Sequence, residues 1–168
     1  MFEKFGEFDS AEELNAAAKR FLEAEDEKSL LELAKENGID KEDAEDYYDG
    51  VVAELTSPIM AARGKLDVES EDLEIKGILT DWRDMILKMC MDDPKMCAAV
   101  RKKGKSLQGC MALFIGFAFD KKEPVSKKIL KETVVTHHGK KEKFKGDLYL
   151  GFPNRKEAKK LIEDYYLG

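Results

Sequence analysis

The order of apolar and polar positions predicts that the chain is helical from residue 11 onward. Leu14, Ala17 and Phe21 recur at intervals of three and four residues, which puts their side chains on one face of a helix. Ser10 stands before this pattern and Glu13 follows three residues later, which is the sequence of a capping box. The first helix is therefore expected to begin directly after Ser10.

Two further helices are expected before residue 50. Residues 27–36 carry leucines on one face, and Asn37-Gly38 is a typical left-handed stop for a helix. Asp40 stands at the N-cap of the next helix, which runs to Tyr48. Residues 27–48 therefore predict a helix, a short turn and a second helix.

The chain after Pro58 is expected to be less regular. Residues 59–62 predict one short helical piece that closes at Arg63-Gly64, and residues 65–72 predict a polar connector. We place a boundary near this connector. It separates an acidic helical subdomain, residues 1–72, from a basic helical subdomain, residues 73–168.

The strongest apolar stripe lies in the second subdomain. Apolar side chains step by three and four over residues 75–89, and Asp93-Pro94 ends that helix because the residue before a proline avoids the helical region. Further helices are expected over residues 95–102 and 106–119. The core is expected to be led by eight residues of these helices: Trp82, Ile86, Met89, Leu107, Met111, Phe114, Ile115 and Ala118.

One late stretch departs from helical spacing. Residues 134–150 contain β-branched and aromatic side chains around His138-Gly139, and they predict either an irregular loop or a small hairpin. A last helix is expected after Asn154, which is a typical N-cap residue. The whole sequence predicts an all-α fold of about seven helices, with one candidate β-hairpin near residues 134–150.

Charge divides the chain more sharply than its net value of -6 suggests. Residues 1–77 hold 9 Lys and Arg against 23 Asp and Glu, a balance of -14. Residues 78–168 hold 20 against 12, a balance of +8. Such segregation indicates either two different electrostatic faces or two halves that dock on each other.

Signals for export or membrane insertion are missing from the sequence. The first residues show no basic stretch followed by an apolar one. The longest apolar run, residues 110–119, is too short to span a bilayer and is expected to be a core helix. Cys90, Cys97 and Cys110 cannot all pair within one chain, so we expect reduced thiols and a cytoplasmic location.

The sequence shows no pattern of a catalytic, metal or nucleotide site. The cysteines lack the short spacings of structural zinc sites, and two of them lie in apolar helical stripes, where a cysteine is usually a core residue. Cys110 could pair with His137 or His138 as a nucleophile, but no orienting acid is evident. We therefore expect no catalytic residue, metal or cofactor. A thiol- or metal-dependent enzyme is the third interpretation, after a binding protein of either kind described below.

Six carboxylates gather on the third predicted helix. The set has the composition of a calcium loop but not its alternating pattern with a glycine and a distal glutamate. It is interpreted either as a solvated helix face or as a strip that mimics a nucleic-acid backbone and enters a basic groove of a partner. Its members are Asp40, Glu42, Asp43, Glu45, Asp46 and Asp49.

Four cations gather at a helix junction in the basic half. They could bind a phosphate there together with helix amides, or they could belong to a solvated surface. The four are Arg101, Lys102, Lys103 and Lys105. Eight lysines extend the positive half beyond them: Lys121, Lys122, Lys127, Lys128, Lys140, Lys141, Lys143 and Lys145.

A family resemblance rests on three pieces of the carboxyl-terminal part. They are Lys105-Ser106-Leu107 leading to Cys110-Met111, the helix that ends in Lys121-Lys122, and the closing helix from Lys156-Glu157-Ala158 to Asp164-Tyr165-Tyr166. In these pieces the chain resembles PcfK-like proteins, which are carried on phages, plasmids and other mobile elements and include inhibitors of the type II CRISPR effector nuclease. The acidic half and residues 134–150 have no counterpart in that pattern.

The resemblance implies a non-enzymatic anti-CRISPR protein of a mobile genetic element. Its partner would be an RNA-guided effector nuclease, whose positively charged channels hold nucleic acid. The acidic strip would compete for such a channel as a DNA mimic, while the basic half would dock on guide RNA or DNA. The alternative is a nucleic-acid-binding accessory protein of a phage or plasmid.

Overall fold

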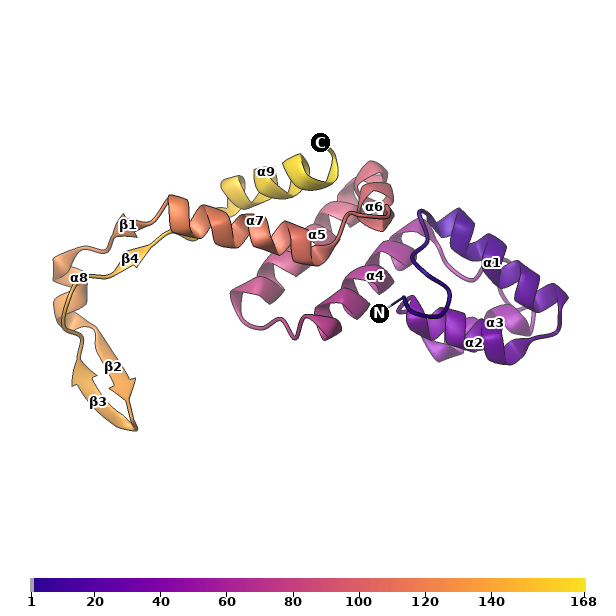
Figure 1. Ribbon diagram of the computed structural model, residues 1–168, viewed down its shortest axis with the longest axis horizontal. Coiled ribbons are helices and arrows are strands. Elements are labelled where there is room, and N and C mark those ends of the chain that lie inside the picture. The colour runs from indigo at the N-terminus through magenta and orange to yellow at the C-terminus, as the bar shows by residue number, and fades with distance from the viewer. Residues whose placement is uncertain (1) are drawn as a thin grey trace.

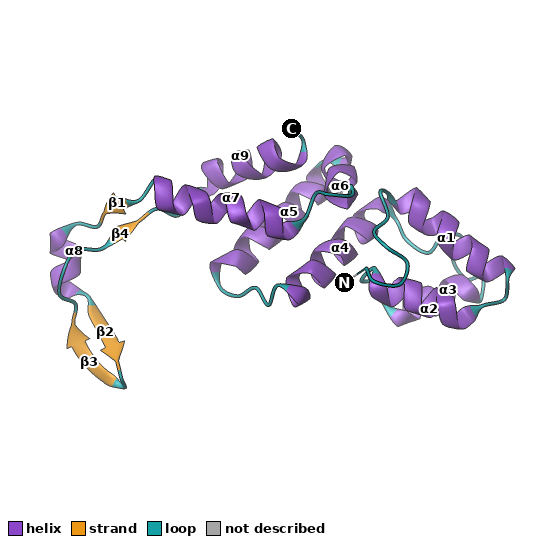
Figure 2. Cartoon of the chain, in the orientation of Figure 1, coloured by secondary structure: helices purple, strands orange, loops and turns teal. Residues whose placement is uncertain are grey.

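The computed structural model describes residues 2–168, and this part of the chain is mostly helical, as the sequence predicts (Figures 1 and 2). Its helices are α1 (Ala11–Glu23), α2 (Glu27–Glu36), α3 (Lys41–Tyr48), α4 (Pro58–Asp72), α5 (Ile78–Asp92), α6 (Pro94–Arg101), α7 (Leu107–Asp120), α8 (Lys127–Glu132) and α9 (Arg155–Tyr166). Its strands are β1 (Glu123–Pro124), β2 (Val134–His137), β3 (Lys140–Lys143) and β4 (Tyr149–Leu150).

The molecule is elongated, with its charged segments at opposite ends. Figure 1 shows α1, α2 and α3 at one end, the helices α4 to α7 and α9 in the middle, and the strands with α8 at the other end. The acidic amino-terminal helices and the lysine-rich late segment therefore lie far apart. No helix of residues 2–168 has the length and apolarity needed to cross a membrane.

Two hydrophobic clusters hold the fold together. The first joins α1, α2 and α3 around Leu14, Leu30 and Leu33, with Ala44 and Tyr47 from α3. The second joins α4 to α7 and α9, and it includes these buried side chains: Ala62, Leu66, Trp82, Ile86, Cys90, Val100, Leu107, Cys110, Met111, Phe114, Ala158 and Ile162. Helix α4 thus packs with the carboxyl-terminal helices although its sequence belongs to the acidic half.

The predicted connector over residues 65–72 is wrong, because α4 continues through it to Asp72. Ser57 caps the helix by accepting a hydrogen bond from the Met60 N–H (3.3 Å), and Pro58 occupies the first turn. Gly64 lies inside the helix instead of closing it. The polar sequence misleads because Lys65 and Glu69 of α4 are buried and paired, so this helix shows no apolar stripe.

The predicted core is confirmed for five residues and wrong for two. Trp82, Ile86, Leu107, Met111 and Phe114 are buried, and Met89 is partly buried against them. On α7, however, Ile115 is 43% exposed and Ala118 is half-buried. Neighbouring helices cover only one face of α7, whereas its apolar residues lie on every face. Some of these residues are therefore exposed.

The late segment forms a hairpin and also a second, shorter ladder. Strands β2 and β3 pair antiparallel around His138-Gly139, and both turn residues have positive φ (48° and 77°), as a type I′ turn requires. Strands β1 and β4 pair antiparallel at the root of the segment. A hairpin was one of the two structures predicted for this stretch, and the structure confirms it. The second ladder and α8 were not predicted, because these elements are too short to show a periodic pattern.

Candidate interaction surfaces

The six predicted carboxylates lie together on and beside α3. Ala44 and Tyr47 anchor this helix in the first hydrophobic cluster, so the other side of the helix faces outward. Asp40, Glu42, Asp46 and Asp49 are exposed, whereas Asp43 and Glu45 are half-buried. A shallow hollow of about 390 Å³ opens between α2 and α3, and its lining is acidic apart from Tyr48: Glu27, Glu42, Glu45, Asp46, Tyr48 and Asp49.

The four predicted cations do not form one exposed cluster. Arg101 is 1% exposed and its guanidinium donates to the Asn37 side-chain oxygen and to the Ala61 carbonyl (3.5 Å). Burial lowers the pKa of Arg101 to about 10, which still leaves the group charged at pH 7. Arg101 therefore connects α6 with the α2–α3 turn and α4 and has no surface to offer to a phosphate.

The loop after Arg101 is docked on acidic residues of the amino-terminal segment. The Lys103 backbone N–H donates to the Asp9 carboxylate (2.8 Å), and Lys103 Nζ lies 3.6 Å from the Glu13 carboxylate. Lys105 Nζ donates to the Tyr165 carbonyl (2.5 Å). Lys102 and Lys103 remain exposed. The contacts of Lys103 with Asp9 and Glu13 join the basic half of the chain to the acidic half.

A buried polar network lies beneath this loop and was not predicted from the sequence. Lys65 is fully buried; its ammonium pairs with Glu7 and donates to the carbonyls of Lys102 (3.0 Å) and Lys105 (2.8 Å). The Glu69 carboxylate accepts a hydrogen bond from the Leu107 N–H (2.7 Å), and burial raises its pKa. Because these groups come from distant parts of the chain, no local pattern in the sequence indicates their pairing.

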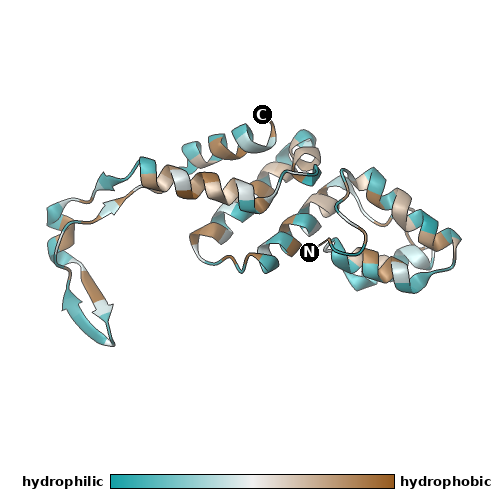
Figure 3. Cartoon of the chain, in the orientation of Figure 1, coloured by the Kyte–Doolittle hydropathy of each residue, from teal (hydrophilic) through white to brown (hydrophobic). Residues whose placement is uncertain are grey.

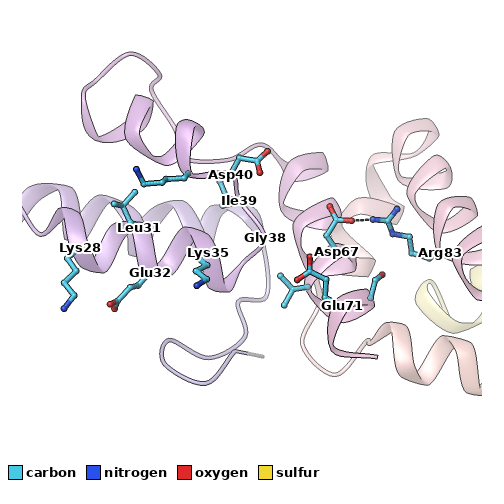
Figure 4. Close-up of a pocket in the computed structure, with 13 residues that line it drawn as sticks. Lys28, Leu31, Glu32, Lys35, Gly38, Ile39, Asp40, Asp67, Glu71 and Arg83 are labelled. Carbon is cyan, nitrogen blue, oxygen red and sulfur yellow. Dashed lines mark ion pairs between the residues drawn. The ribbon is translucent and has the colours of Figure 1, made fainter. Parts of the chain in front are cut away.

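A cleft of about 700 Å³ is bordered on one side by α2 and the α2–α3 turn and on the other side by α4 and α5 (Figure 4). An ion pair between Asp67 and Arg83 lies on its far wall. Charges of both signs alternate around the rest of the lining: Lys28, Lys35, Lys41, Glu32, Asp40 and Glu71. This mixed lining favours neither a polyanion nor a polycation.

Helix α7 leaves three large apolar side chains exposed to solvent, of which Ile115 and Phe119 are neighbours on one face. Leu113 and Ile115 are more than 40% exposed and Phe119 is 69% exposed. Figure 3 shows this helix as one of the most hydrophobic of the molecule. Exposed apolar neighbours such as Ile115 and Phe119 are a feature of protein contact sites.

The three cysteines are buried in the core, as the sequence predicts. All three are buried, and burial raises the pKa of both Cys90 and Cys110 to about 12. Burial also raises the pKa of Cys97, whose thiol donates to the Cys90 carbonyl (2.9 Å). His137 and His138 lie on the hairpin, in a different element from any of them.

We expect these thiols to resist alkylation in the native protein. At pH 7.5 iodoacetamide should label none of them within the time that labels a free cysteine, because burial both excludes the reagent and suppresses the thiolate. All three should react in denaturant. Mass spectrometry of the intact protein gives both results, and rapid native labelling of Cys110 would contradict its place in the core.

The chain shows no likeness that identifies these surfaces. Among residues 2–168 no group of three or more histidine, cysteine, aspartate or glutamate side chains is placed to hold a metal ion. No family model, curated protein or solved structure matches the chain. The surfaces themselves therefore carry the functional argument.

Proposed function

We propose that this protein is a non-enzymatic inhibitor that binds a type II CRISPR effector nuclease and occludes part of its nucleic-acid channel. The observation that carries the proposal is the exposed acidic surface of α3, defined by Glu42, Asp46 and Asp49. The resemblance of the carboxyl-terminal pieces to PcfK-like proteins supports the choice of partner. Effector nucleases of this class hold nucleic acid in positively charged channels.

The geometry of the acidic surface suits competition with a nucleic-acid backbone. Glu42 and Asp46 are four residues apart on α3, and Asp49, its C-cap, follows three residues later. This spacing places the three side chains along one side of the helix, with successive Cβ atoms about 5–6 Å apart. The helix is anchored by Ala44 and Tyr47 and does not have to become ordered on binding. A rigid row of negative charge can occupy a basic groove in place of phosphates.

The exposed apolar side chains of α7 support a protein as the partner. Charge alone steers association and gives specificity, whereas buried apolar surface supplies most of the lasting contact energy. Leu113, Ile115 and Phe119 provide such surface on the middle of the molecule. An inhibitor would use the acidic end for the channel and the Ile115–Phe119 side of α7 for a neighbouring part of the nuclease.

The proposal is tested by measuring complex formation with the guide-loaded nuclease. We expect the wild-type chain to form a complex of near-equal stoichiometry, detected by size exclusion with light scattering. A variant with Glu42→Gln, Asp46→Asn and Asp49→Asn should bind about tenfold or more weakly, since each lost contact between opposite charges costs up to about 1 kcal/mol.

The matched control removes three exposed carboxylates elsewhere, with Asp72→Asn, Asp92→Asn and Asp164→Asn. It changes the net charge by the same amount and should bind like the wild type. Equal weakening of both variants would show that net charge, and not the α3 surface, governs the interaction. Absence of any complex with effectors of several subtypes would overturn the proposal.

A further inference from the structure

The segment from Lys121 to Leu150, here called the arm, projects from the end of α7 away from the helical body (Figure 1). It contains β1, α8, the β2–β3 hairpin and β4, and within it Leu130 is buried while most other side chains are exposed. Figure 2 shows that the hairpin forms its tip. A segment that buries so little is not needed for the core, which indicates a role in contact with a partner.

The arm is strongly basic in an otherwise acidic chain. Residues 121–150 hold nine lysines and four acidic residues, a balance of +5, while the whole chain carries -6. Two of these lysines form ion pairs within the arm, Lys127 with Asp147 and Lys143 with Glu132. The others form no salt bridge among residues 2–168: Lys121, Lys122, Lys128, Lys131, Lys140, Lys141 and Lys145.

The two faces of the hairpin differ in charge. Directly paired residues of an antiparallel ribbon share a face, and successive pairs alternate between faces. The pairs Val134 with Lys143 and Thr136 with Lys141 therefore lie on one face, which has no acidic residue of the hairpin. Lys143 is paired with Glu132 of α8, so Lys141 is the cation of this face without a salt bridge. On the other face Glu142 lies 3.8 Å from His137, so that face is partly neutralised.

We propose that the arm binds duplex DNA, with the β2–β3 hairpin in the major groove and the surrounding lysines on the phosphates. The major groove of B-form DNA admits a two-stranded ribbon, and the face with Val134 and Thr136 offers methyl groups that suit thymine. The major groove of A-form RNA is too deep and narrow for such a ribbon. A protein partner is disfavoured because lysine is depleted from protein interfaces.

This inference goes beyond nuclease inhibition and uses different residues from the α3 surface. DNA binding by the arm would let the protein contact target or displaced DNA beside a bound nuclease. The alternative function, a nucleic-acid-binding accessory protein, would then depend on the arm. It would not depend on Arg101, because that residue is buried.

The test measures binding of the full chain to a fluorescent DNA duplex by anisotropy, between about 50 and 200 mM salt. The wild type should bind, with an affinity that falls steeply as salt rises. The arm variant carries Lys128→Ala, Lys140→Ala, Lys141→Ala and Lys145→Ala. Its slope of log affinity against log salt should be shallower by about 3–4, because each phosphate contact contributes about 0.9.

The matched control carries Lys19→Ala, Lys28→Ala, Lys88→Ala and Lys160→Ala, all exposed on the helical body. It loses the same charge and should bind DNA within about twofold of the wild type, a difference of less than 0.5 kcal/mol. A second variant, Thr136→Asp, puts a negative charge on the lysine face and should weaken binding about tenfold or more, because it repels phosphates there.

Several outcomes would overturn the inference. The wild type would fail to bind DNA at about 50 mM salt, or the arm variant and the control would lose DNA affinity equally. Tighter binding of an RNA duplex than of a DNA duplex of the same sequence would also overturn it. The arm variant should still bind the guide-loaded nuclease through the α3 surface. Failure of DNA binding is therefore distinguishable from failure of the proposed inhibition.

Discussion

Replacement of Lys65 by methionine is expected to lower the free energy of unfolding by about 3–5 kcal/mol. The Lys65 ammonium is the positive centre of the buried network and is bonded to Glu7 and to two backbone carbonyls. Methionine fills similar space but donates no hydrogen bond. The change would leave the Glu69 carboxylate without its nearest cation and the carbonyls of Lys102 and Lys105 without a donor.

Urea denaturation followed by circular dichroism measures this loss. The control is Lys88→Met, which makes the same change at an exposed position on α5 and should alter stability by less than about 0.5 kcal/mol. Adding Glu69→Gln to Lys65→Met should restore part of the loss, because it removes the unpaired charge but keeps an acceptor for the Leu107 N–H. A loss below about 1 kcal/mol for Lys65→Met would contradict the network.

The second large effect is expected for Gly64→Ala in α4. Alanine normally stabilises the interior of a helix by about 1 kcal/mol relative to glycine. At this position a Cβ atom would lie 2.2 Å from the Asn37 carbonyl oxygen and 2.9 Å from that of Gly38, both in backbone that cannot move away easily. We therefore expect a loss of about 1–3 kcal/mol or more, because the α2–α3 turn must separate from α4.

Gly116→Ala in α7 is the matched control for this change. Gly116 also lies inside a helix, but a Cβ atom there would meet no atom within 4 Å. The same substitution should raise the melting temperature at residue 116 and lower it at residue 64. A stabilising effect at both sites would show that α4 does not touch the turn at Asn37-Gly38.

The sequence allowed the helices to be predicted where an apolar face or a cap marks them locally. Asn154 forms the expected capping box with Glu157, and Ser10 accepts a hydrogen bond from the Glu13 N–H (3.2 Å). Helix α4 was underestimated because Lys65 and Glu69 look solvent-exposed in sequence. Their burial depends on partners at residues 7 and 102–107, which are distant in the chain.

The candidate surfaces were predictable to different degrees, depending on whether their residues are neighbours in the sequence. The carboxylates of α3 are adjacent in sequence and lie on one helix, so their grouping follows from helical geometry. Arg101 was assigned to a surface with its neighbours, but it turns inward to Asn37. The arm was visible as a run of lysines, whereas its projection from the body became evident from the arrangement of the elements in space.

The central claim, inhibition through the α3 surface, is tested most directly by a DNA-cleavage titration. A guide-loaded type II effector is mixed with increasing amounts of the wild-type chain, the α3 variant or the variant with changes at Asp72, Asp92 and Asp164. Wild type and control should abolish cleavage near one molecule per nuclease, while the α3 variant should need a large excess. Full cleavage at excess wild type, or equal inhibition by the α3 variant, would contradict the claim.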